Sequence, residues 1–566
     1  MGLVVIGILS VTTAPYLFGA LTAPPNKHFM GLVLNVPDHA QYLAWYRGFQ
    51  TAFFIPNRLT PEPNPPVYFN LLWWVLGRLG RYTGLHYALV YQTFRSLAGA
   101  FFLAVLYLFI ALNFPDVLRR RVALVVAALA SGFGWVLVVL KYTLTRGELL
   151  YPLDVYIAEG NSFLCMMAYP HFIEAAGLIL LVFWLLIVGE RRRQLRYAIY
   201  AGLVAQFLGW QHGYDLIIVW GVPATYIGAR LLRDRQLPIH WVKSLVIVGL
   251  LSWPPALYAV LLTSLHPFWR KVLAQFASAG VFTPSPPHMF ILLGLPFIAA
   301  LVTILLWLWN TGRRAGSPSP LPGEAGLFVG AWFLVGWALA YIPTNFQVHM
   351  LNSWQVPIGI LATGGLFQLL KARRRAGRFW SRRYFQNLPA AIFILLVVPT
   401  NLYLLAWRFV DLNRHDYPYY LHEDDLAALN WLQKSAQPDD IVLSSLTIGQ
   451  YIPALTDSRA FLAHWAQTVD FLQKREMVNL YFSAATSEDK RIEIIREHDI
   501  RYVFYGGPER ALGVYDPDGS PYLGKVFSTG KVSVYEVRLE SSKARECGRL
   551  NQGDHPRSPR DLSTGV

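Results

Sequence analysis

Charged residues and cysteines are both scarce in this sequence, and each scarcity argues against a class of protein. Only 15% of the 566 residues are charged and 54% are hydrophobic, whereas charged residues make up about 25% of ordinary soluble domains. The two cysteines, Cys165 and Cys547, stand far apart and have no metal-ligand spacing around them. The composition therefore excludes a disulfide framework and a cysteine-based zinc site, and it disfavours a soluble protein.

The hydrophobic residues instead form long runs. Segments such as 101–112, 172–188 and 291–308 belong to runs near the roughly 20 residues that cross a hydrocarbon core of about 30 Å. We predict about eleven membrane-spanning helices. They lie near residues 1–22, 86–113, 122–141, 169–189, 196–211, 214–231, 241–262, 289–309, 325–342, 354–370 and 388–407.

The net charge of +15 comes from basic clusters that lie between these spans. Arginines at 119–121, 191–193 and 373–375, for example, fall in alternate short loops. By the positive-inside rule such loops are cytoplasmic, so we expect the N-terminus in the cytoplasm and the chain after about residue 408 outside it. The basic clusters thus indicate topology and give no support for a nucleic-acid partner.

Four longer connections fall on the predicted outer side, at residues 23–85, 142–168, 263–288 and 343–353. Because sites are commonly carried by loops on a rigid scaffold, we expect the functional site on this side. The first connection has aromatic residues at helical spacing, which predict an amphipathic helix in the headgroup region: Tyr42, Trp45, Tyr46, Phe49 and Phe53. A second apolar stretch, 67–79, is short for a span, and we expect it at the interface or partly re-entrant.

After residue 408 the composition shifts toward mixed charge and predicts a separate domain. Helical patterns at 423–434 and 487–497 alternate with strand patterns at 440–444, 500–505 and 531–537. This alternation predicts an extracytoplasmic α/β domain over 408–540. The remaining residues, 541–566, have the composition of a disordered tail. The predicted fold class is a polytopic α-helical membrane protein with a C-terminal extracytoplasmic α/β domain.

Asp38 is the first candidate for chemistry. It follows the first span and opens the predicted interfacial helix, where a partly desolvated carboxylate can take a proton from a hydroxyl. The alternative is structural, because an aspartate at the N-cap with Gln41 three residues later is a capping-box arrangement. The two interpretations are compatible.

Histidines are unevenly distributed about the predicted membrane. All of those before residue 400 except His240 fall on the outer side or its edge, including His39, His171, His212 and His349. A divalent ion bound by Asp38, His39 and His171 is one interpretation, and ordinary hydrogen-bonded packing is the other.

Charged residues inside or beside the spans are further candidates, because they are costly in a membrane. Arg95 lies about 13 Å into the second span at 1.5 Å per residue, and a structural pairing with Glu174 or Asp215 is the alternative to a functional role. Arg270 and Lys271 in the third outer connection suit an anionic headgroup. The other outer connections supply residues that could bind sugar, phosphate, metal or water: Glu148, Asp154, Glu159, Asn345 and Gln347.

This arrangement resembles the C-type (GT-C) superfamily of membrane glycosyltransferases, which use lipid-phosphate-linked sugars. The resemblance rests on the first span, the acidic residue Asp38 opening a large outer loop, the many spans and the outer C-terminal domain. Smaller details resemble bacterial members that act in envelope-glycan synthesis: Asn57 with 60–64, Pro170-His171, Pro343 with Phe346-Gln347, 428–432 and 452–454. Two departures are Val348-His349-Met350, where basic residues are expected, and His39, where a second acidic residue is expected.

The resemblance implies a transferase that moves a sugar from a polyprenyl-phosphate donor to a hydroxyl of a glycan, lipid or protein acceptor, with inversion. It implies Asp38 as general base and a plasma (inner) membrane location. No cofactor is certain, and a divalent metal stays open. The implied substrate-binding residues are His39, Glu62, Arg95, Asp154, Glu159, His171, His212, Arg270, Lys271, Gln347 and His349.

Two other functions stay open on the sequence. A transporter would explain the many spans, but the sequence lacks the paired repeats with broken helices that transporters often show. A non-catalytic glycan-binding or lipid-binding subunit on the same scaffold is the other, because fold does not fix function. Sugar transfer by the purified protein distinguishes the transferase from both.

Overall fold

The computed structural model describes residues 2–144, 155–278, 282–313, 321, 323–376 and 388–539. The chain forms two compact units. The first, called the helical unit here, comprises Met1–Asn57, Glu62–His422 and Trp465–Val469. The second, the α/β unit, comprises Arg58–Pro61, Glu423–His464 and Asp470–Val566. The division falls later than the predicted boundary near 408, because β2 (Tyr420–His422) pairs with β1 (Lys27–Phe29) of the helical unit.

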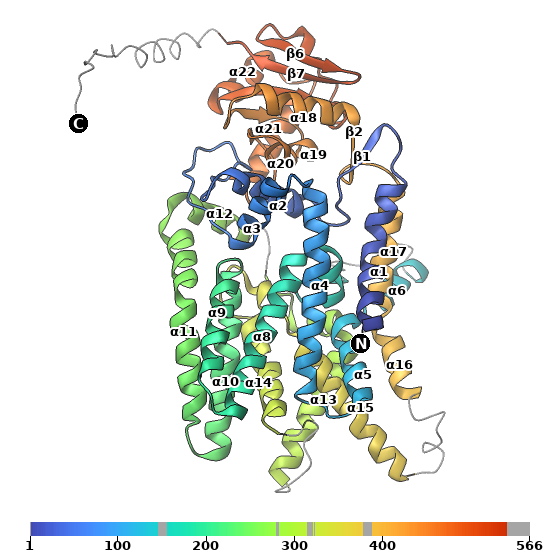
Figure 1. Ribbon diagram of the computed structural model, residues 1–566. Helices are drawn as coiled ribbons and strands as arrows, with labels where there is room; N and C mark the ends of the chain where they lie inside the picture. Colours follow the sequence, from blue (N-terminus) through green and yellow to red (C-terminus); the bar gives the residue numbers. More distant parts are fainter. Residues whose placement is uncertain are drawn as a thin grey trace, which may run out of the picture. The chain divides into compact units, whose positions relative to one another are not determined.

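The helical unit consists mainly of α-helices that run alongside one another (Figure 1). Their bounds are α1 Gly2–Leu21, α2 Val36–Thr51, α3 Leu71–Thr83, α4 Tyr87–Ala111, α5 Val117–Leu129, α6 Gly134–Thr143, α7 Ser162–Ala168, α8 Pro170–Arg192, α9 Arg196–Gly209, α10 Leu216–Asp234, α11 Ile239–Val260, α12 Pro267–Ser278, α13 Pro286–Arg313, α14 Gly323–Ala340, α15 Gln355–Ala376, α16 Leu388–Val397 and α17 Pro399–Leu412. Three short helical turns, η1 Gly213–Asp215, η2 Leu261–Leu265 and η3 Gln347–Leu351, join them.

Each predicted span corresponds to one helix or to one bent pair of helices. Within the described residues, seven helices are long and apolar enough to cross a membrane, or up to nine if the bent pairs α5–α6 and α16–α17 each count as one span. The helices α9 and α15 are not among them, and the 14 residues of α9 would rise only about 21 Å. The protein is an integral multi-pass membrane protein, and the total of eleven spans stays a prediction.

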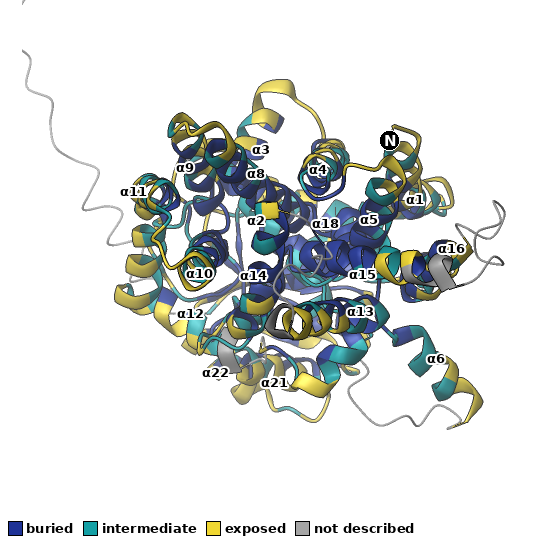
Figure 2. Cartoon of the chain, turned by 90° about the horizontal axis from the view of Figure 1, so that it is seen from below, coloured by how far each residue is buried: buried dark blue, intermediate teal, exposed yellow. Residues whose placement is uncertain are grey.

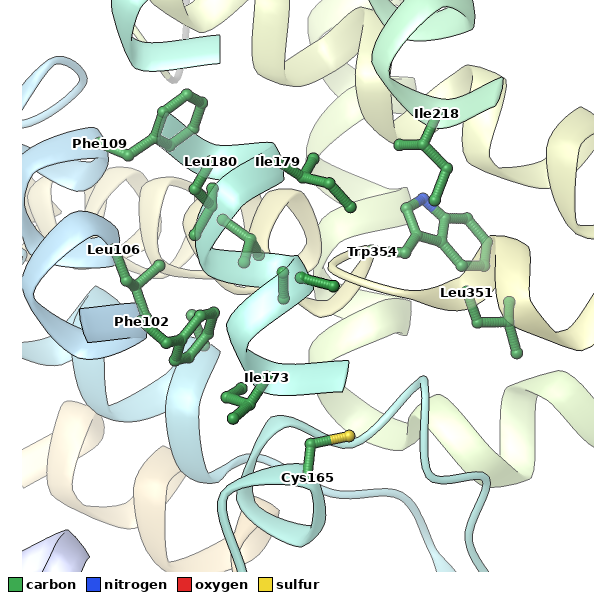
Figure 3. Close-up of a cluster of buried hydrophobic side chains, with 14 of the residues drawn as sticks. Phe102, Leu106, Phe109, Cys165, Ile173, Ile179, Leu180, Ile218, Leu351 and Trp354 are labelled. Carbon is green, nitrogen blue, oxygen red and sulfur yellow. The ribbon is translucent and has the colours of Figure 1, made fainter. Parts of the chain in front are cut away.

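The core of the helical unit surrounds α8, whose apolar window is 89% buried. Figure 2 shows buried residues gathered on α8, α14 and α15, with exposed residues on the outward face of α11. Phe102, Leu106 and Phe109 of α4 lie beside Ile173 and Leu180 of α8 in one buried cluster, and Ile179 projects from the other side of α8 toward Ile218 and Trp354 (Figure 3). The part of α8 between Glu174 and Glu190 is apolar on all sides, which is typical of a helix buried in a core.

Three helices of this unit are interrupted beside one another. Gly294 breaks α13 with φ 61 and ψ −148, and the bent pairs turn by 52° and 45°. The freed backbone groups bond across the breaks: Ser131 N donates to Val397 O at 2.6 Å, and Phe133 N donates to Ile291 O at 2.7 Å. These bonds satisfy backbone groups that an apolar environment would leave unpaired, which is what permits breaks at such positions.

The first outer connection forms the expected pair of helices, α2 and α3, but its aromatic face is placed differently from the prediction. Tyr46 and Phe49 are buried against α3 and α4, with Leu72, Trp73, Leu76, Val90 and Tyr91 around them, instead of facing lipid. A Cβ at Gly77 would lie 2.7 Å from the Tyr46 carbonyl oxygen, so glycine permits the close approach of α3. Arg78 and Arg81 donate to carbonyl oxygens at residues 50–52, where a helix C-terminus favours cations.

The α/β unit contains a five-stranded mixed sheet in the order β4-β3-β5-β7-β6. β3 (Ile441–Leu443) is parallel to β4 (Arg459–Ala460) and β5 (Ile500–Tyr505), whereas β7 (Val532–Val537) is antiparallel to β5 and β6 (Leu523–Thr529). The main helices are α18 Glu423–Ser435, α21 Phe471–Phe482 and α22 Glu488–Glu497. The five predicted elements correspond to α18, β3, α22, β5 and β7, while β4, β6 and α21 were not predicted. The predicted tail, 541–566, lies outside the described residues.

Candidate active site

Asp38 lies in the first turn of α2, with Asn35 as the N-cap residue at φ 44 and ψ 58. The capping-box interpretation of Asp38 and Gln41 is therefore wrong, because Asp38 is already inside the helix. Asn35 Nδ2 donates to Asp38 Oδ2 at 2.5 Å, and Trp465 Nε1 donates to Asp38 Oδ1 at 3.2 Å. The carboxylate is half-buried, and both of its oxygens are held at a helix N-terminus, which favours negative charge.

His39 is buried, with 2% of its surface exposed. Its Nδ1 lies 2.9 Å from Asn35 O, and its Nε2 lies 2.6 Å from Ala168 O. Because both partners are hydrogen-bond acceptors, neither ring nitrogen presents a free lone pair to a ligand.

Arg95 is completely buried, and its guanidinium group is surrounded by neutral partners. It donates to Gln92 Oε1 at 2.7 Å, to Thr13 Oγ1 at 2.8 Å and to Met166 O at 3.2 Å. The Tyr16 ring lies below it at 4.6 Å. These partners replace the expected pairing with an acidic residue of α8 or η1.

The contacts of Arg95 and His39 converge on the C-terminal end of α7. Met166 O accepts from Arg95, Met167 O accepts from the Tyr16 hydroxyl at 2.8 Å, and Ala168 O contacts His39. The last carbonyl groups of a helix lack partners within the helix and carry partial negative charge. Arg95 and His39 therefore fix the junction at which α7 ends and α8 begins.

His171 and His212 lie in a buried polar cluster at that junction. Their ring centroids are 5.3 Å apart. His212 Nδ1 lies 3.2 Å from Asp215 Oδ2, which also accepts from Asn352 Nδ2 at 3.0 Å. In the described part of the chain, His171 Nδ1 and Asp215 Oδ1 are buried without a hydrogen-bond partner. Buried polar atoms of this kind are uncommon and mark a candidate binding site.

Glu174 and Gln211 extend the cluster by one turn of α8. Gln211 Nε2 donates to Glu174 Oε2 at 2.6 Å. The sequence Gln211-His212-Gly213-Tyr214-Asp215 is polar between two apolar runs, and this contrast was a signal that could have identified the cluster.

His349 and Glu159 form a second imidazole–carboxylate pair. His349 Nδ1 lies 2.7 Å from Glu159 Oε1, and the His349 ring stacks on Tyr214 with a centroid distance of 4.4 Å and an angle of 13°. Phe172 contacts both His349 and His212 through its ring. The structure thus brings together His171, His212, His349 and Glu159 from connections that are far apart in the sequence.

Tyr42 connects this histidine cluster to the helix that carries Asp38. Its ring lies 4.6 Å from that of His171 and stacks on Trp73 at 4.9 Å. Burial, followed by the nearby Asp38 carboxylate, raises the pKa of Tyr42 well above its ordinary value. Tyr42 is therefore neutral at physiological pH and can act as a hydrogen-bond donor.

The other predicted site residues have different positions. Arg270 and Lys271 are exposed on α12, and Gln347 is half-buried at the start of η3. Glu62 is half-buried in the proline-rich stretch 60–66, where its carbonyl oxygen accepts from Asn64 Nδ2 at 2.9 Å. Asp154, like Glu148, lies outside the described residues.

The predicted metal-ligand set does not fit a metal ion in this arrangement. Both carboxylate oxygens of Asp38 accept hydrogen bonds, and both ring nitrogens of His39 face carbonyl oxygens. Within the residues that the structure describes, no group of three His, Cys, Asp or Glu side chains could hold a metal ion.

No protein-family model matches this sequence, and no curated protein matches it by sequence. Solved structures do match. The Archaeoglobus fulgidus oligosaccharyltransferase tethered with an acceptor peptide matches with a TM-score of 0.50 at 14% identity, over 88% of this chain and 69% of that chain. The same enzyme, AglB, in complex with an inhibitory peptide and a dolichol-phosphate gives 0.50 at 13% identity over the same shares. Another match is a zinc and sulfate complex of that enzyme, at 0.50 and 13%, over 93% and 73%.

Arabinofuranosyltransferase AftD from Mycobacteria matches with a TM-score of 0.52 at 13% identity, over 94% of this chain and 40% of that chain. These proteins are glycosyltransferases of the C-type fold. The chain therefore has the GT-C fold of membrane glycosyltransferases, with a sheet-containing C-terminal unit. The fold that the sequence predicted is confirmed.

Proposed function

We propose that this protein is a membrane glycosyltransferase that moves a sugar from a polyprenyl-phosphate donor to an acceptor hydroxyl, with Asp38 as the general base. The observation that carries the proposal is the Asp38 carboxylate, which two side-chain donors orient in the first turn of α2. The same helix carries Tyr42 against the buried histidine cluster. This transfer requires a fixed base and, near it, imidazole rings that can carry positive charge.

The geometry of Asp38 suits proton transfer. The bonds from Asn35 and Trp465 hold the Asp38 carboxylate in one orientation at the start of α2, as a general base requires. As that hydroxyl attacks the anomeric carbon, its proton passes to Asp38 and the bond to the donor phosphate breaks. A single displacement of this kind inverts the anomeric centre.

The departing phosphate needs positive charge, and the two imidazole–carboxylate pairs supply it in our proposal. Asp215 and Glu159 orient the rings of His212 and His349 through Nδ1. When protonated, a ring held in this way donates its second N–H to a phosphate oxygen. Arg95 is not assigned this role, because its donors are bonded to neutral groups in a buried site. Arg270 and Lys271 add exposed positive charge on α12 that would attract the anionic donor.

A lipid-linked donor is supported by the fold, because the neighbouring AglB structure contains a dolichol-phosphate. We further propose a plasma (inner) membrane location, with the N-terminus in the cytoplasm and the α/β unit outside. The basic loops between the spans support that orientation. A glycan, lipid or protein acceptor is compatible with this site.

The test is transfer of labelled sugar from a panel of polyprenyl-phosphate donors by the purified protein in lipid vesicles. The Asp38→Asn variant keeps the side-chain shape and removes the base, so we expect it to lose transfer. Asp489→Asn, on the exposed surface of α22, is the matched control and should retain it. A fully active Asp38→Asn variant would disprove the assignment of the base. Donor binding without transfer by the unaltered protein would instead indicate a non-catalytic subunit.

A further inference from the structure

The segment Trp465–Val469 belongs to the helical unit, although the residues on both sides of it in the sequence belong to the α/β unit. Trp465 Nε1 donates to Asp38 Oδ1 at 3.2 Å. Gln467 accepts from Asn57 Nδ2 through its backbone oxygen at 3.1 Å and through Oε1 at 3.3 Å. The segment is thus bonded to α2 and to Asn57 in the connection between α2 and α3.

The other end of the segment is held on α12. Thr468 O accepts from Gln275 Nε2 at 3.0 Å, and the buried Val469 packs with Trp269 and Val272. Because these contacts do not involve the Trp465 indole N–H, they hold the segment whether or not that N–H is present. The bond to Asp38 can therefore be removed without removing the anchors of the segment.

We propose that Trp465 is a positioning residue that fixes the Asp38 carboxylate in its reactive orientation, an inference that rests on the function proposed above. The terminal torsion of an aspartate is soft, and the bond from Asn35 acts on one carboxylate oxygen, Oδ2. The second bond, from Trp465 to Oδ1, fixes the plane of the carboxylate. The activity of the helical unit then depends on a residue that lies 427 positions from the base.

This role differs from that of a residue that only packs. Trp465 is half-buried, and its donor atom reaches a charged oxygen, where the loss of one hydrogen bond has a larger effect than between neutral groups. Trp269 offers a matched comparison in the same unit. Its indole is buried and stacks on Tyr68 at 5.1 Å, and its Nε1 has no hydrogen-bond partner within the described residues.

The experiment compares sugar transfer by the full-length protein in lipid vesicles for Trp465→Phe, Trp465→His, Trp269→Phe and Asp38→Asn. We expect Trp465→Phe to lower kcat about tenfold or more, with the KM for the donor changed less than about twofold. Trp465→His keeps a ring N–H and should recover part of the loss. Trp269→Phe should leave kcat near the unaltered value. The thermal unfolding midpoint, followed for every variant, should not fall with Trp465→Phe.

Each contrary outcome has a distinct meaning. An unchanged kcat for Trp465→Phe, together with an inactive Asp38→Asn variant, would overturn the positioning role while the proposed function stands. Equal losses in Trp465→Phe and Trp269→Phe, or a loss of kcat that follows a lower unfolding midpoint, would show a packing role and overturn the inference. An active Asp38→Asn variant would remove the base assignment, and with it the role of Trp465.

Discussion

His349 Nδ1 lies 2.7 Å from Glu159 Oε1, and this pair joins the segment before α7 to η3. The His349 side chain is 13% exposed and that of Glu159 is 8% exposed, so water screens the pair far less than it screens a surface ion pair. Stacking on Tyr214 holds the imidazole plane. The carboxylate and the stacked ring together hold the His349 imidazole in one orientation.

Replacing Glu159 by Gln should weaken donor binding, because an amide orients the His349 ring less firmly than a carboxylate does. We expect the KM for the polyprenyl-phosphate donor to rise about tenfold, measured by initial rates over a range of donor concentrations. Glu493→Gln is the matched control, because Glu493 pairs with Lys490 on the surface of α22, where the side chains are 59% and 49% exposed. An unchanged KM for Glu159→Gln would exclude this pair from donor binding.

Arg95→Lys should reduce stability more than it changes donor binding. A lysine ammonium cannot reproduce the planar fork that reaches Gln92, Thr13 and the end of α7, and the side chain at this position is completely buried. We expect a loss of about 2 kcal/mol or more in the free energy of unfolding, measured in detergent by the unfolding midpoint. If the variant is as stable as the unaltered protein but has a higher donor KM, Arg95 contributes to binding the donor phosphate and not mainly to stability.

Arg270 and Lys271 should behave in the opposite way. Replacing both by Gln should leave the unfolding midpoint unchanged, because the two side chains are exposed on α12. The donor KM should rise, and its dependence on salt should weaken, since exposed charges attract an anionic donor mainly over distances of about 8–10 Å at moderate salt. Initial rates at low and high salt test this. An unchanged salt dependence would show that these cations do not contribute to donor capture.

The helices and the central strands could be predicted because their signals are local. The long apolar run that forms α8 and the short, mostly buried run that forms β5 each lie within one continuous segment, so the length and composition of each run were enough. The break at Gly294 was missed, because the run around it is uniformly apolar and the partner of the break, Phe133, is far away in the sequence. The strand β4 has two residues, too few to show any period.

The candidate site was predicted only in part, for the same reason. Asp38 and the outward histidines could be identified from their positions beside the spans. Their partners could not: Trp465 is brought to Asp38, and Glu159 to His349, by tertiary folding alone. For Arg95 the sequence predicted too much. A charge inside a span suggested an ionic or functional partner, whereas the guanidinium group donates to neutral oxygens, including Met166 O at the end of α7.

Removal of divalent cations should leave sugar transfer intact. The donor atoms of Asp38 and His39 are already hydrogen-bonded, and a metal ion would have to displace these bonds to bind there. Transfer by vesicles treated with a chelator and assayed before and after addition of manganese or zinc measures this. Activity that disappears on chelation and returns with the metal would contradict the expectation.

Glu509 should make the α/β unit less stable as pH rises. It is fully buried, and its carboxylate accepts from Ser445 N at 2.8 Å and from Gly506 N at 2.9 Å. Burial raises the pKa of Glu509 above its ordinary value, although these hydrogen bonds oppose the shift. Since the folded form holds the proton more tightly than the unfolded form, stability is greatest below the unfolded pKa and is lost as pH rises through the folded pKa.

The loss should appear in hydrogen exchange of the full-length protein. We expect the protection of β5, corrected for the intrinsic exchange rate, to be higher at about pH 5 than at about pH 8. Glu509→Gln has no titrating group and should remove most of that difference, although its amide places a donor against a backbone N–H and lowers stability at every pH. Asp518→Asn on the surface of the same unit is the control and should keep the difference. Protection that rises with pH in the unaltered protein would mean that the two backbone donors stabilise the ionised carboxylate more than burial destabilises it.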